Sequence, residues 1–437
     1  AYFDVFPKIF RAHKKGTIRI AGRGPHAAFA DELCYSVTVI PRNETNLNEP
    51  ERSYTVYELT PRGGVLSVLH DFGDEGCYAL IVKPKDKELP PPPPRKSWPV
   101  YLEVQRFYVY ALDEDLFCLR PYRGDMHVHS FRSDGKETPA VVAANYRRAG
   151  FDFLALTDHE QYAPSLEAID DFKDIPIDLC LFTGEEVHPP GDNTHYVHFA
   201  GERSVNDIFK NEQGRYEREI AEMVRTLDVP QGINRLKYAS CLWVCAEIKK
   251  AGGMSIMVHP HWIEEDAYHV PEKMCIYMLK NAPFDAFELT GGQTQAENQM
   301  QISLWQQLRA EGRYIPVVGS SDAHSTEAAF TWFNISKMAV LAKDCSKDSI
   351  ISAVRNRQVV VMEQYPGETL PRLYGEYRYT AFMLFLLEEY FPLHDELCFE
   401  EGRLMKEYAC GGKEAAALLN ALHGRCESLM QKCWDKK

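Results

Sequence analysis

Phe153-Leu154-Ala155-Leu156-Thr157-Asp158-His159 is a short apolar run that ends in three polar side chains. An apolar run of four to eight residues, bounded by polar or turn residues, is typical of a buried β-strand. Runs of this form recur from about residue 124 onward, with helical spacing between them. This alternation of buried strands and helices predicts a parallel α/β architecture.

Further predicted elements follow along the same part of the chain. Strands are predicted over residues 179–183, 195–200, 254–258, 284–289 and 314–319, and helices over 235–251 and 297–310. Another helix is predicted between Thr138, which can cap it, and Gly150, which can end it. Polar side chains follow most of these strands, and barrel enzymes place their chemistry at the carboxyl ends of strands. The pattern therefore predicts a catalytic centre.

The two ends of the chain have different patterns. Residues 17–83 alternate and turn like antiparallel strands, which predicts a small β-sandwich. The run Pro90–Pro94 predicts a stiff connector or an exposed loop. Beyond about residue 340 the pattern is largely helical, most clearly over 377–390 and 414–432. We therefore predict an accessory β-sandwich over residues 1–120, an α/β barrel over 121–340 and a mostly helical extension over 341–437.

The composition is that of a folded chain with little affinity for polyanions. Of 437 residues 45% are hydrophobic, and the net charge is −14, which argues against stable nucleic-acid or membrane binding. The longest apolar run, Tyr379 to Leu387, is too short to span a bilayer, and the sequence starts without a basic, apolar leader. We therefore expect a cytoplasmic protein with reduced cysteines, for which oligomer formation stays open.

His127-Val128-His129 is the motif that indicates chemistry. Alternate residues of a strand point to one side, so two imidazoles separated by one apolar residue can bind one metal ion. Asp322 and His324 form a matching pair after the last predicted strand. Ten of the fifteen histidines fall between residues 127 and 324. These observations predict a metal-dependent hydrolase.

Six segments in order resemble the polymerase and histidinol phosphatase (PHP) superfamily of metal-dependent phosphoesterases. They are His127-Val-His129-Ser130-Phe-Arg-Ser133-Asp134-Gly135, Leu156-Thr157-Asp158-His159, Gly184-Glu185-Glu186-Val187, His195-Tyr-Val-His198-Phe, Val258-His259-Pro260 and Gly319-Ser-Ser-Asp322-Ala-His324. The resemblance covers about half of the chain, roughly residues 122–335. It implies a distorted (β/α)7 barrel that holds two or three divalent ions.

The resemblance also implies which residues bind these ions. His127, His129, Glu186 and Asp322 would hold one ion, Glu186 would bridge to a second held by His195 and His259, and Asp134, His159 and His324 would hold a third. Mn, Fe and Zn all suit such mixed nitrogen and oxygen ligands. Water between two of the ions would lose a proton and attack phosphorus in line.

Two choices between neighbouring side chains follow from the strand pattern. Glu185 and Glu186 point opposite ways on an extended segment, so only one can bridge, and the spacing from Gly184 favours Glu186. His195 is preferred over His198, which would then lie in the core or behind the ligands. His188 and His261 are expected to lie behind the ligands or at the rim of the site rather than to bind metal.

Three residues are candidates for a direct role in the reaction. His324 or His159 could act as an acid toward the leaving group if it is not fully committed to metal. Arg132, in the loop after the first strand of the barrel, could clamp the phosphate, because a guanidinium binds phosphate oxygens through two parallel hydrogen bonds.

The expected function is hydrolysis of a phosphate monoester or phosphodiester of a small molecule or nucleotide by a metal-bridging hydroxide. One rival is an amidohydrolase-type metal hydrolase, but those enzymes usually bridge their ions with a lysine, whereas the expected bridge here is a glutamate. The other rival is a metal-bound binding or regulatory module without catalysis. The intact ligand set argues against that second rival.

Overall fold

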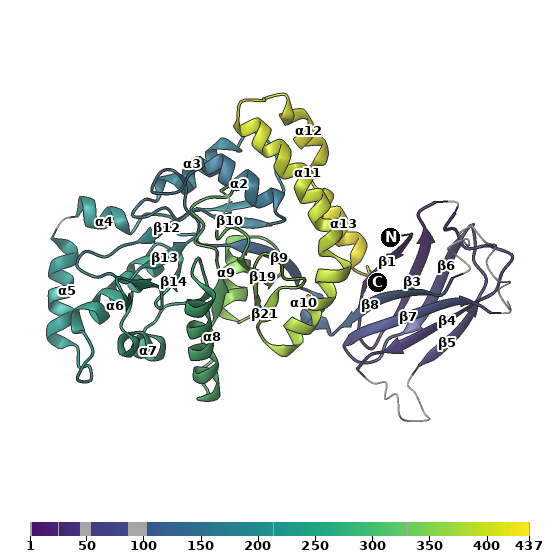
Figure 1. Cartoon of the computed structure of the whole chain (residues 1–437), viewed down its shortest axis with the longest axis horizontal. Coiled ribbons are helices and arrows are strands. Elements are labelled where there is room, and N and C mark those ends of the chain that lie inside the picture. The colour runs from purple at the N-terminus through teal and green to yellow at the C-terminus, as the bar shows by residue number, and fades with distance from the viewer. Residues whose placement is uncertain are drawn as a thin grey trace. The chain divides into compact units, whose positions relative to one another are not determined.

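The computed structural model describes residues 2–24, 26–43, 54–85, 103–212, 214–328 and 331–436, so the predicted Pro90–Pro94 connector lies outside the described residues. The chain divides into two compact units (Figure 1). Unit 1 comprises residues 1–119, 381–394 and 424–437, and unit 2 comprises residues 120–380 and 395–423. The residues after 340 are therefore shared between the units.

The described residues of unit 1 form two β-sheets. One has the order β1 (Phe3–Phe6), β3 (Lys15–Gly22) and β6 (Val65–Asp71), and the other has the order β2 (Ile9–Arg11), β8 (Gln105–Leu112), β7 (Gly76–Pro84), β4 (Tyr35–Pro41) and β5 (Thr55–Leu59). Alternate residues point inward, as Val37 and Val39 of β4 do, and one apolar cluster draws residues from both sheets. The short helix α1 (Glu114–Phe117) follows β8.

The C-terminal residues of unit 1 bond to its first strands. The amide of Lys8 donates to the carbonyl oxygen of Cys433 at 2.8 Å, and Ile9 forms a parallel bridge with Trp434. These contacts join residues at opposite ends of the sequence, which is why the last segment groups with the N-terminal strands.

Unit 2 is mixed α/β, and the part of it that the structure describes forms two larger sheets and a small hairpin. One sheet has the order β11 (Cys180–Phe182), β10 (Phe153–Ala155), β9 (Arg120–Asp125), β19 (Ser336–Ala342), β20 (Val359–Glu363) and β21 (Arg372–Tyr374). The other has the order β12 (Gly184–Val187), β13 (Tyr196–Phe199), β14 (Met254–Met257), β17 (Ala286–Thr290) and β18 (Val317–Gly319). The hairpin pairs β15 (Ile263–Glu264) with β16 (Ala267–Tyr268). The first sheet thus continues beyond residue 340.

Two isolated bridges connect these larger sheets into a ring. Val128, after β9, pairs in parallel with Ala323, after β18, and His159, after β10, pairs in parallel with Glu186 of β12. Hydrogen bonding therefore runs around β9, β10, β12, β13, β14, β17 and β18. The ring is not all-parallel, because β13 runs antiparallel to both β12 and β14.

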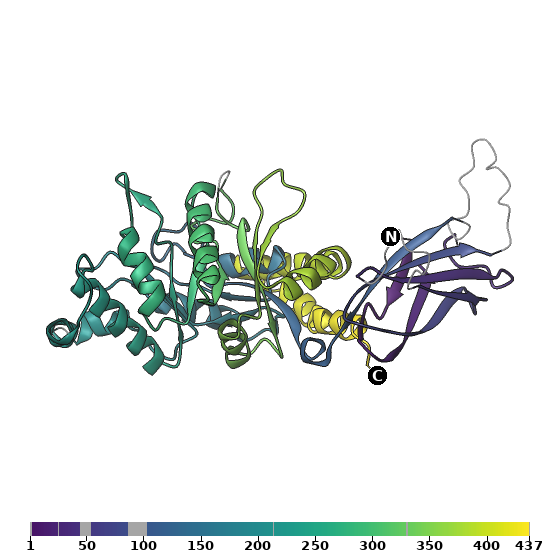
Figure 2. The ribbon, with the colours of Figure 1, turned by 90° about the horizontal axis from the view of Figure 1, so that it is seen from below.

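Helices of unit 2 lie around the outside of its strands (Figures 1 and 2). They are α2 (Pro139–Arg148), α3 (Ala163–Asp171), α4 (Asn206–Asn211), α5 (Arg215–Thr226), α6 (Arg235–Lys250), α7 (Glu272–Asn281), α8 (Gln295–Ala310), α9 (Lys347–Arg355) and α12 (Ala415–Leu422). Helices α10 (Tyr377–Glu389) and α11 (Phe391–Ala409) contribute to both units, and α13 (Arg425–Cys433) belongs to unit 1. In the described part of the chain, each helix is too short or too polar to cross a membrane.

The local signals for helix ends operate as the sequence predicts. The Thr138 side chain accepts a hydrogen bond from the Val141 amide at the start of α2, and Gly150 follows the helix with a φ of 91°. Such a left-handed conformation favours glycine. At α8, Thr294 and Glu297 form a reciprocal capping box. These caps fix where the loops between strands and helices begin and end.

Candidate metal centre

The segments that close the ring also carry the predicted ligands. The amide of Asp322 donates to the His127 carbonyl at 2.9 Å, and the amide of His129 donates to the Ala323 carbonyl at 3.0 Å. This pairing places the Asp322 carboxylate 3.3 Å from His127 Nε2 and 2.9 Å from His129 Nε2. Both histidine side chains are fully buried. The backbone therefore sets the spacing of the innermost donors.

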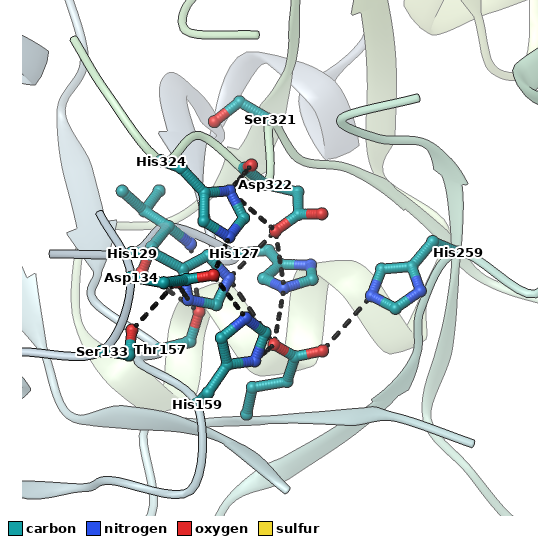
Figure 3. Close-up of polar contacts among 12 residues, drawn as sticks. His127, His129, Ser133, Asp134, Thr157, His159, His259, Ser321, Asp322 and His324 are labelled. Atoms are coloured by element: carbon teal, nitrogen blue, oxygen red, sulfur yellow. Dashed lines mark hydrogen bonds and ion pairs between the residues drawn. The ribbon is translucent and has the colours of Figure 1, made fainter. Parts of the chain in front are cut away.

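Glu186 lies between two groups of histidines, and its two carboxylate oxygens face different groups. Oε2 lies 3.5 Å from both His127 Nε2 and His129 Nε2, and 2.6 Å from His159 Nδ1. The rings of these histidines converge in Figure 3. The Glu186 side chain is fully buried, so this carboxylate has its charge compensated only by the groups around it.

The other oxygen of Glu186 faces the opposite group. Oε1 lies 2.8 Å from His195 Nδ1 and 3.2 Å from His259 Nε2. His195, His259 and His269 place donor atoms within 4.8 Å of one another. One carboxylate therefore connects two clusters, which is the arrangement needed to bridge two ions.

A third cluster lies toward solvent. His129, Asp134, His159 and His324 offer atoms within 4.8 Å of one another. Asp134 Oδ2 lies 3.5 Å from His159 Nε2 and 3.2 Å from His324 Nε2. His324 Nδ1 lies 2.8 Å from the backbone oxygen of Asp322, a contact in which the ring nitrogen donates. That bond leaves Nε2 free to act as a ligand atom.

The neighbouring alternatives point away from these clusters. Glu185 accepts hydrogen bonds from Ser204 Oγ at 2.6 Å and from the amide of Val205, and it pairs with His198 Nδ1 at 2.9 Å. Both side chains are fully buried, and the two residues are paired across β12 and β13. The structure thus brings Glu186 and His195 into the centre and uses Glu185 and His198 to hold the following loop.

The buried donor atoms fit divalent cations. Among the described residues, His127 Nε2, His129 Nε2, Glu186 Oε2 and Asp322 Oδ1 are buried and make no hydrogen bond. Most buried polar atoms in proteins are hydrogen-bonded, so a group of such atoms that converge requires an explanation. Imidazole nitrogens and carboxylate oxygens are suitable ligands for Zn, Mn and Fe. The set therefore fits the ions that the motifs imply.

Electrostatics keep the carboxylates in the form that binds cations. Burial alone would raise the pKa of Glu186, but the charges of His195 and His127 hold it well below its ordinary value. The pKa of Asp134 is likewise lowered by hydrogen bonds from His159 and His324, against the opposing effect of burial. Because metal ligands must be deprotonated, ionised carboxylates are ready to coordinate.

A second carboxylate lies behind the cluster and was not predicted. Glu288, in β17, lies with Oε2 3.0 Å from His127 Nδ1, and its Oε1 accepts from the His259 amide at 3.3 Å. It is fully buried. A carboxylate that binds the outer nitrogen of a ligand histidine fixes the ring orientation and the tautomer. A glutamate inside the apolar run 284–289 was the available sequence signal.

Asp158 positions the loop that carries Asp134. Its Oδ1 accepts hydrogen bonds from the amides and hydroxyls of both Ser130 and Ser133, at 2.8–3.0 Å. Asp158 is fully buried. The side chain therefore holds the turn after His129 rather than facing the ion clusters.

Arg132 is the one predicted site residue that the structure leaves outside the clusters. Its Nε and Nη2 donate to the two oxygens of Glu167 at 2.7 and 2.9 Å. The side chain is 45% exposed, and it is absent from the described lining of both cavities at the site. The guanidinium thus already makes the two-pronged contact that was predicted for a phosphate.

Two cavities meet at the metal centre. The inner one, of about 420 Å³, is lined by members of all three clusters, among them Asp134, His259 and Asp322. The outer one, of about 550 Å³, is lined by residues of the 188–193 loop, α4 and the β15–β16 hairpin. His188, His195 and Trp262 line both cavities. A ligand at the clusters can therefore extend into a second, larger space.

Comparisons with known proteins give structural matches. No family model matches the sequence, and no curated protein matches it. A two-domain protein from Bacteroides vulgatus, described as containing a predicted PHP-like metal-dependent phosphoesterase, matches 56% of this chain at 17% identity and a TM-score of 0.39. The match spans 65% of that protein, less than two thirds of its length.

Two further solved structures match about half of the chain. A putative metal-dependent phosphoesterase from Bifidobacterium adolescentis matches 47% of this chain and 89% of its own, with 18% identity and a TM-score of 0.34. An amidohydrolase from Chromobacterium violaceum, solved with sulfate and no metal, matches 48% and 90%, with 19% identity and a TM-score of 0.31. The comparison with solved structures thus finds the same similarity to PHP-like proteins that the motifs indicate. At these TM-scores it carries no argument about substrate or mechanism, so the chemistry is derived from the side chains.

Proposed function

We propose that this chain is a metal-dependent phosphoesterase that hydrolyses a phosphate ester of a small molecule or nucleotide. The observation that carries the proposal is the position of Glu186, whose two oxygens face separate histidine groups 2.6–3.5 Å away. A carboxylate in this position suits the bridge of a multinuclear hydrolase. Manganese, iron and zinc are all compatible with the donors.

The donors divide among three ion positions in this proposal. The first takes His127, His129, Glu186 and Asp322; the second takes Glu186, His195 and His259; the third takes Asp134, His159 and His324. Ions held there would activate a water molecule and neutralise negative charge that develops on the phosphate. Glu288 keeps Nε2 of His127 directed at the cluster through the bond to Nδ1.

Proton transfer to the departing oxygen requires a group that reaches the substrate. His159 and His324 both line the inner cavity, and both retain exposed side-chain surface. We include in the proposal that one of these two donates that proton in a state in which it does not bind the third ion. Arg132 has no such role in the proposal, because Glu167 occupies its guanidinium.

The third cluster favours a phosphate ester over an amide. A phosphoryl group has several oxygens that carry charge, and three cations arranged around a cavity can each meet one of them. No lysine lines the inner cavity in the part of the chain that the structure describes. These features support the phosphoesterase over the amidohydrolase-type alternative.

The outer cavity supports a substrate with a sizeable organic part. Trp262 and Phe209 offer aromatic surface there, and Asn193 and Asn206 offer amide groups. Its charged side chains are mostly acidic, with Glu160, Asp192 and Glu264 against Lys210 alone among the described lining. An alcohol portion that is neutral and rich in hydroxyl groups would suit this lining better than a second phosphate.

The test compares two ligand variants with a matched surface variant. Zinc- or manganese-reconstituted protein should release phosphate or p-nitrophenol from a panel of esters, and His129→Ala and Asp322→Ala should abolish this release. His13→Ala, whose side chain is 63% exposed in unit 1, should retain full activity. Hydrolysis that survives both ligand substitutions would refute the proposal.

The finer architecture belongs to the same proposal. We propose that residues 1–120 form an accessory β-sandwich and that residues 121–340 form a distorted (β/α)7 barrel. We also propose a cytoplasmic location and a free small-molecule substrate, with no stable nucleic-acid partner. Solution scattering of the full chain would check the domain architecture. A binding assay with duplex DNA would check the expectation of no stable nucleic-acid partner.

A further inference from the structure

His269 reaches the metal centre by way of the β15–β16 hairpin. The register pairs Ile263 with Tyr268 and Glu264 with Ala267, and the amide of His269 donates to the Trp262 carbonyl at 2.7 Å. The turn residues Glu265 and Asp266 both have positive φ, of 48° and 63°. Two consecutive left-handed residues form the tight turn that suits a twisted hairpin. The hairpin therefore brings His269 back beside Trp262, the residue just before β15.

This return places His269 beside two ligands of the second ion position. Its ring centroid lies 4.5 Å from that of His195 and 5.5 Å from that of His259. The three histidines offer donor atoms within 4.8 Å of one another. His269 is the third imidazole of this group, and Oε1 of Glu186 faces the other two.

The His269 side chain is buried, and its ring nitrogens are unusual among the described residues in their lack of hydrogen bonds. It is 3% exposed, and neither Nδ1 nor Nε2 has a hydrogen-bond partner among the described residues. The nearest carboxylate, Glu264, lies 3.7 Å from Nδ1, which is too long for a hydrogen bond. Leaving a buried donor or acceptor unsatisfied is costly. A metal ion would satisfy one nitrogen of the ring.

The strained turn supports a specific role for this position. Residues other than glycine, asparagine and aspartate seldom adopt positive φ, and Glu265 does so here. Such strain persists only where the surrounding structure enforces it. Contacts at the base of the hairpin do this, because the Val270 amide donates to the Pro260 carbonyl at 3.0 Å.

We propose that His269 is a protein ligand of the second ion, together with Glu186, His195 and His259. The proposal rests on the metal centre of the function proposed above, and it adds a ligand that the motif resemblance did not include. Four protein donors would hold this ion more tightly than three. The hairpin would then be the element that completes the site.

The experiment measures metal binding in variants that separate ligation from packing. His269→Phe keeps a ring against Trp262 and removes both nitrogens, whereas His269→Asp removes the ring and keeps a donor. His261→Ala is the matched control, because His261 is also a buried histidine of this loop but belongs to none of the three clusters described above. Zinc content is counted by elemental analysis after dialysis, and affinity is measured by chelator competition.

Ligation and packing predict opposite orders for the two variants. If His269 binds the ion, His269→Phe loses about one zinc equivalent or binds it about 100-fold more weakly, and His269→Asp stays nearer to wild type. His261→Ala keeps the wild-type zinc content. A His269→Phe protein with the wild-type number of ions and unchanged affinity would overturn the proposal.

A measurement without substitution covers the case in which a variant does not fold. Wild-type protein with 15N-labelled histidine is loaded with 113Cd²⁺, and a one-bond nitrogen–cadmium coupling at His269 reports ligation directly. Absence of that coupling, with couplings present at His195 and His259, also overturns the proposal. Wild-type protein that shows the coupling but hydrolyses no phosphate ester would refute the proposed function alone.

Discussion

The inner and outer parts of the metal centre differ in how they are built. Glu186, His127 and His129 have fully buried side chains at or next to the hydrogen bonds that close the ring. In the outer cluster, Asp134 is 54% exposed and His324 is 34% exposed. Charges attract more strongly where water is excluded. The inner ions should therefore be held tightly, and the outer ion should exchange more readily with solution.

The largest effect should come from the residue that links both inner positions. Glu186→Gln removes the negative charge that faces six histidines, so activity should fall by about 1000-fold or more, with loss of the inner ions. Steady-state kinetics and elemental analysis measure both quantities.

The adjacent glutamate provides the control. Glu185→Gln should lower the melting temperature, because Glu185 accepts hydrogen bonds from the loop after β13, but it should leave the metal content near wild type. Equal metal loss in both variants would contradict the assignment of Glu186 as the bridge.

Asp134→Asn tests the outer cluster. Loss of this carboxylate should weaken the outer ion and reduce activity by about 100-fold, while two inner ions remain bound. Metal titration of the variant followed by activity measurement at raised metal concentration checks this, since excess metal should restore part of the rate. A variant that loses all its ions would show that the inner and outer positions are not independent.

Glu288→Gln tests the support behind the inner cluster. The amide can still contact His127 Nδ1 but no longer carries a charge, so inner-ion affinity should fall by about 10-fold to 100-fold. Chelator competition measures the affinity, and kcat at saturating metal should change much less. A fall in kcat with unchanged affinity would mean that Glu288 acts on substrate instead.

Arg132→Ala should have the smallest effect. Because its guanidinium is paired with Glu167, kcat/KM for a phosphate ester should change by no more than about threefold, within the range expected for an exposed ion pair. A large rise in KM would instead reinstate Arg132 as a phosphate clamp. Glu167→Ala distinguishes the cases, since it would free the arginine for substrate.

The sequence predicts the donors that follow directly from strand geometry. His127 and His129 lie two residues apart at a strand end. The two-residue period of an extended segment allows only one of Glu185 and Glu186 to bridge, and the spacing from Gly184 favours Glu186. Such rules apply within a few residues of chain, so they need no knowledge of the tertiary fold. The geometry places all nine predicted metal donors in or beside the clusters.

The remaining features depend on contacts between distant segments. Glu288 acts on His127 only because the closed ring brings a side chain of β17 within reach of the residues that follow β9. His269 depends on a turn at Glu265 and Asp266 that lacks the glycine by which tight hairpins are usually recognised. The grouping of residues 424–437 with the first strands likewise rests on bonds such as Lys8 to Cys433, which no local pattern encodes.

The bridges that close the ring connect metal supply with the stability of the fold. Val128–Ala323 and His159–Glu186 are single-residue pairs, and one hydrogen bond contributes only about 1 kcal/mol. An ion present at 100 times its Kd adds about 2.7 kcal/mol to the free energy of unfolding. Since the donors flank the two bridges that close the ring, each bound ion would stabilise this part of unit 2. A cell short of metal would then lose the protein to unfolding and proteolysis as well as lose its activity.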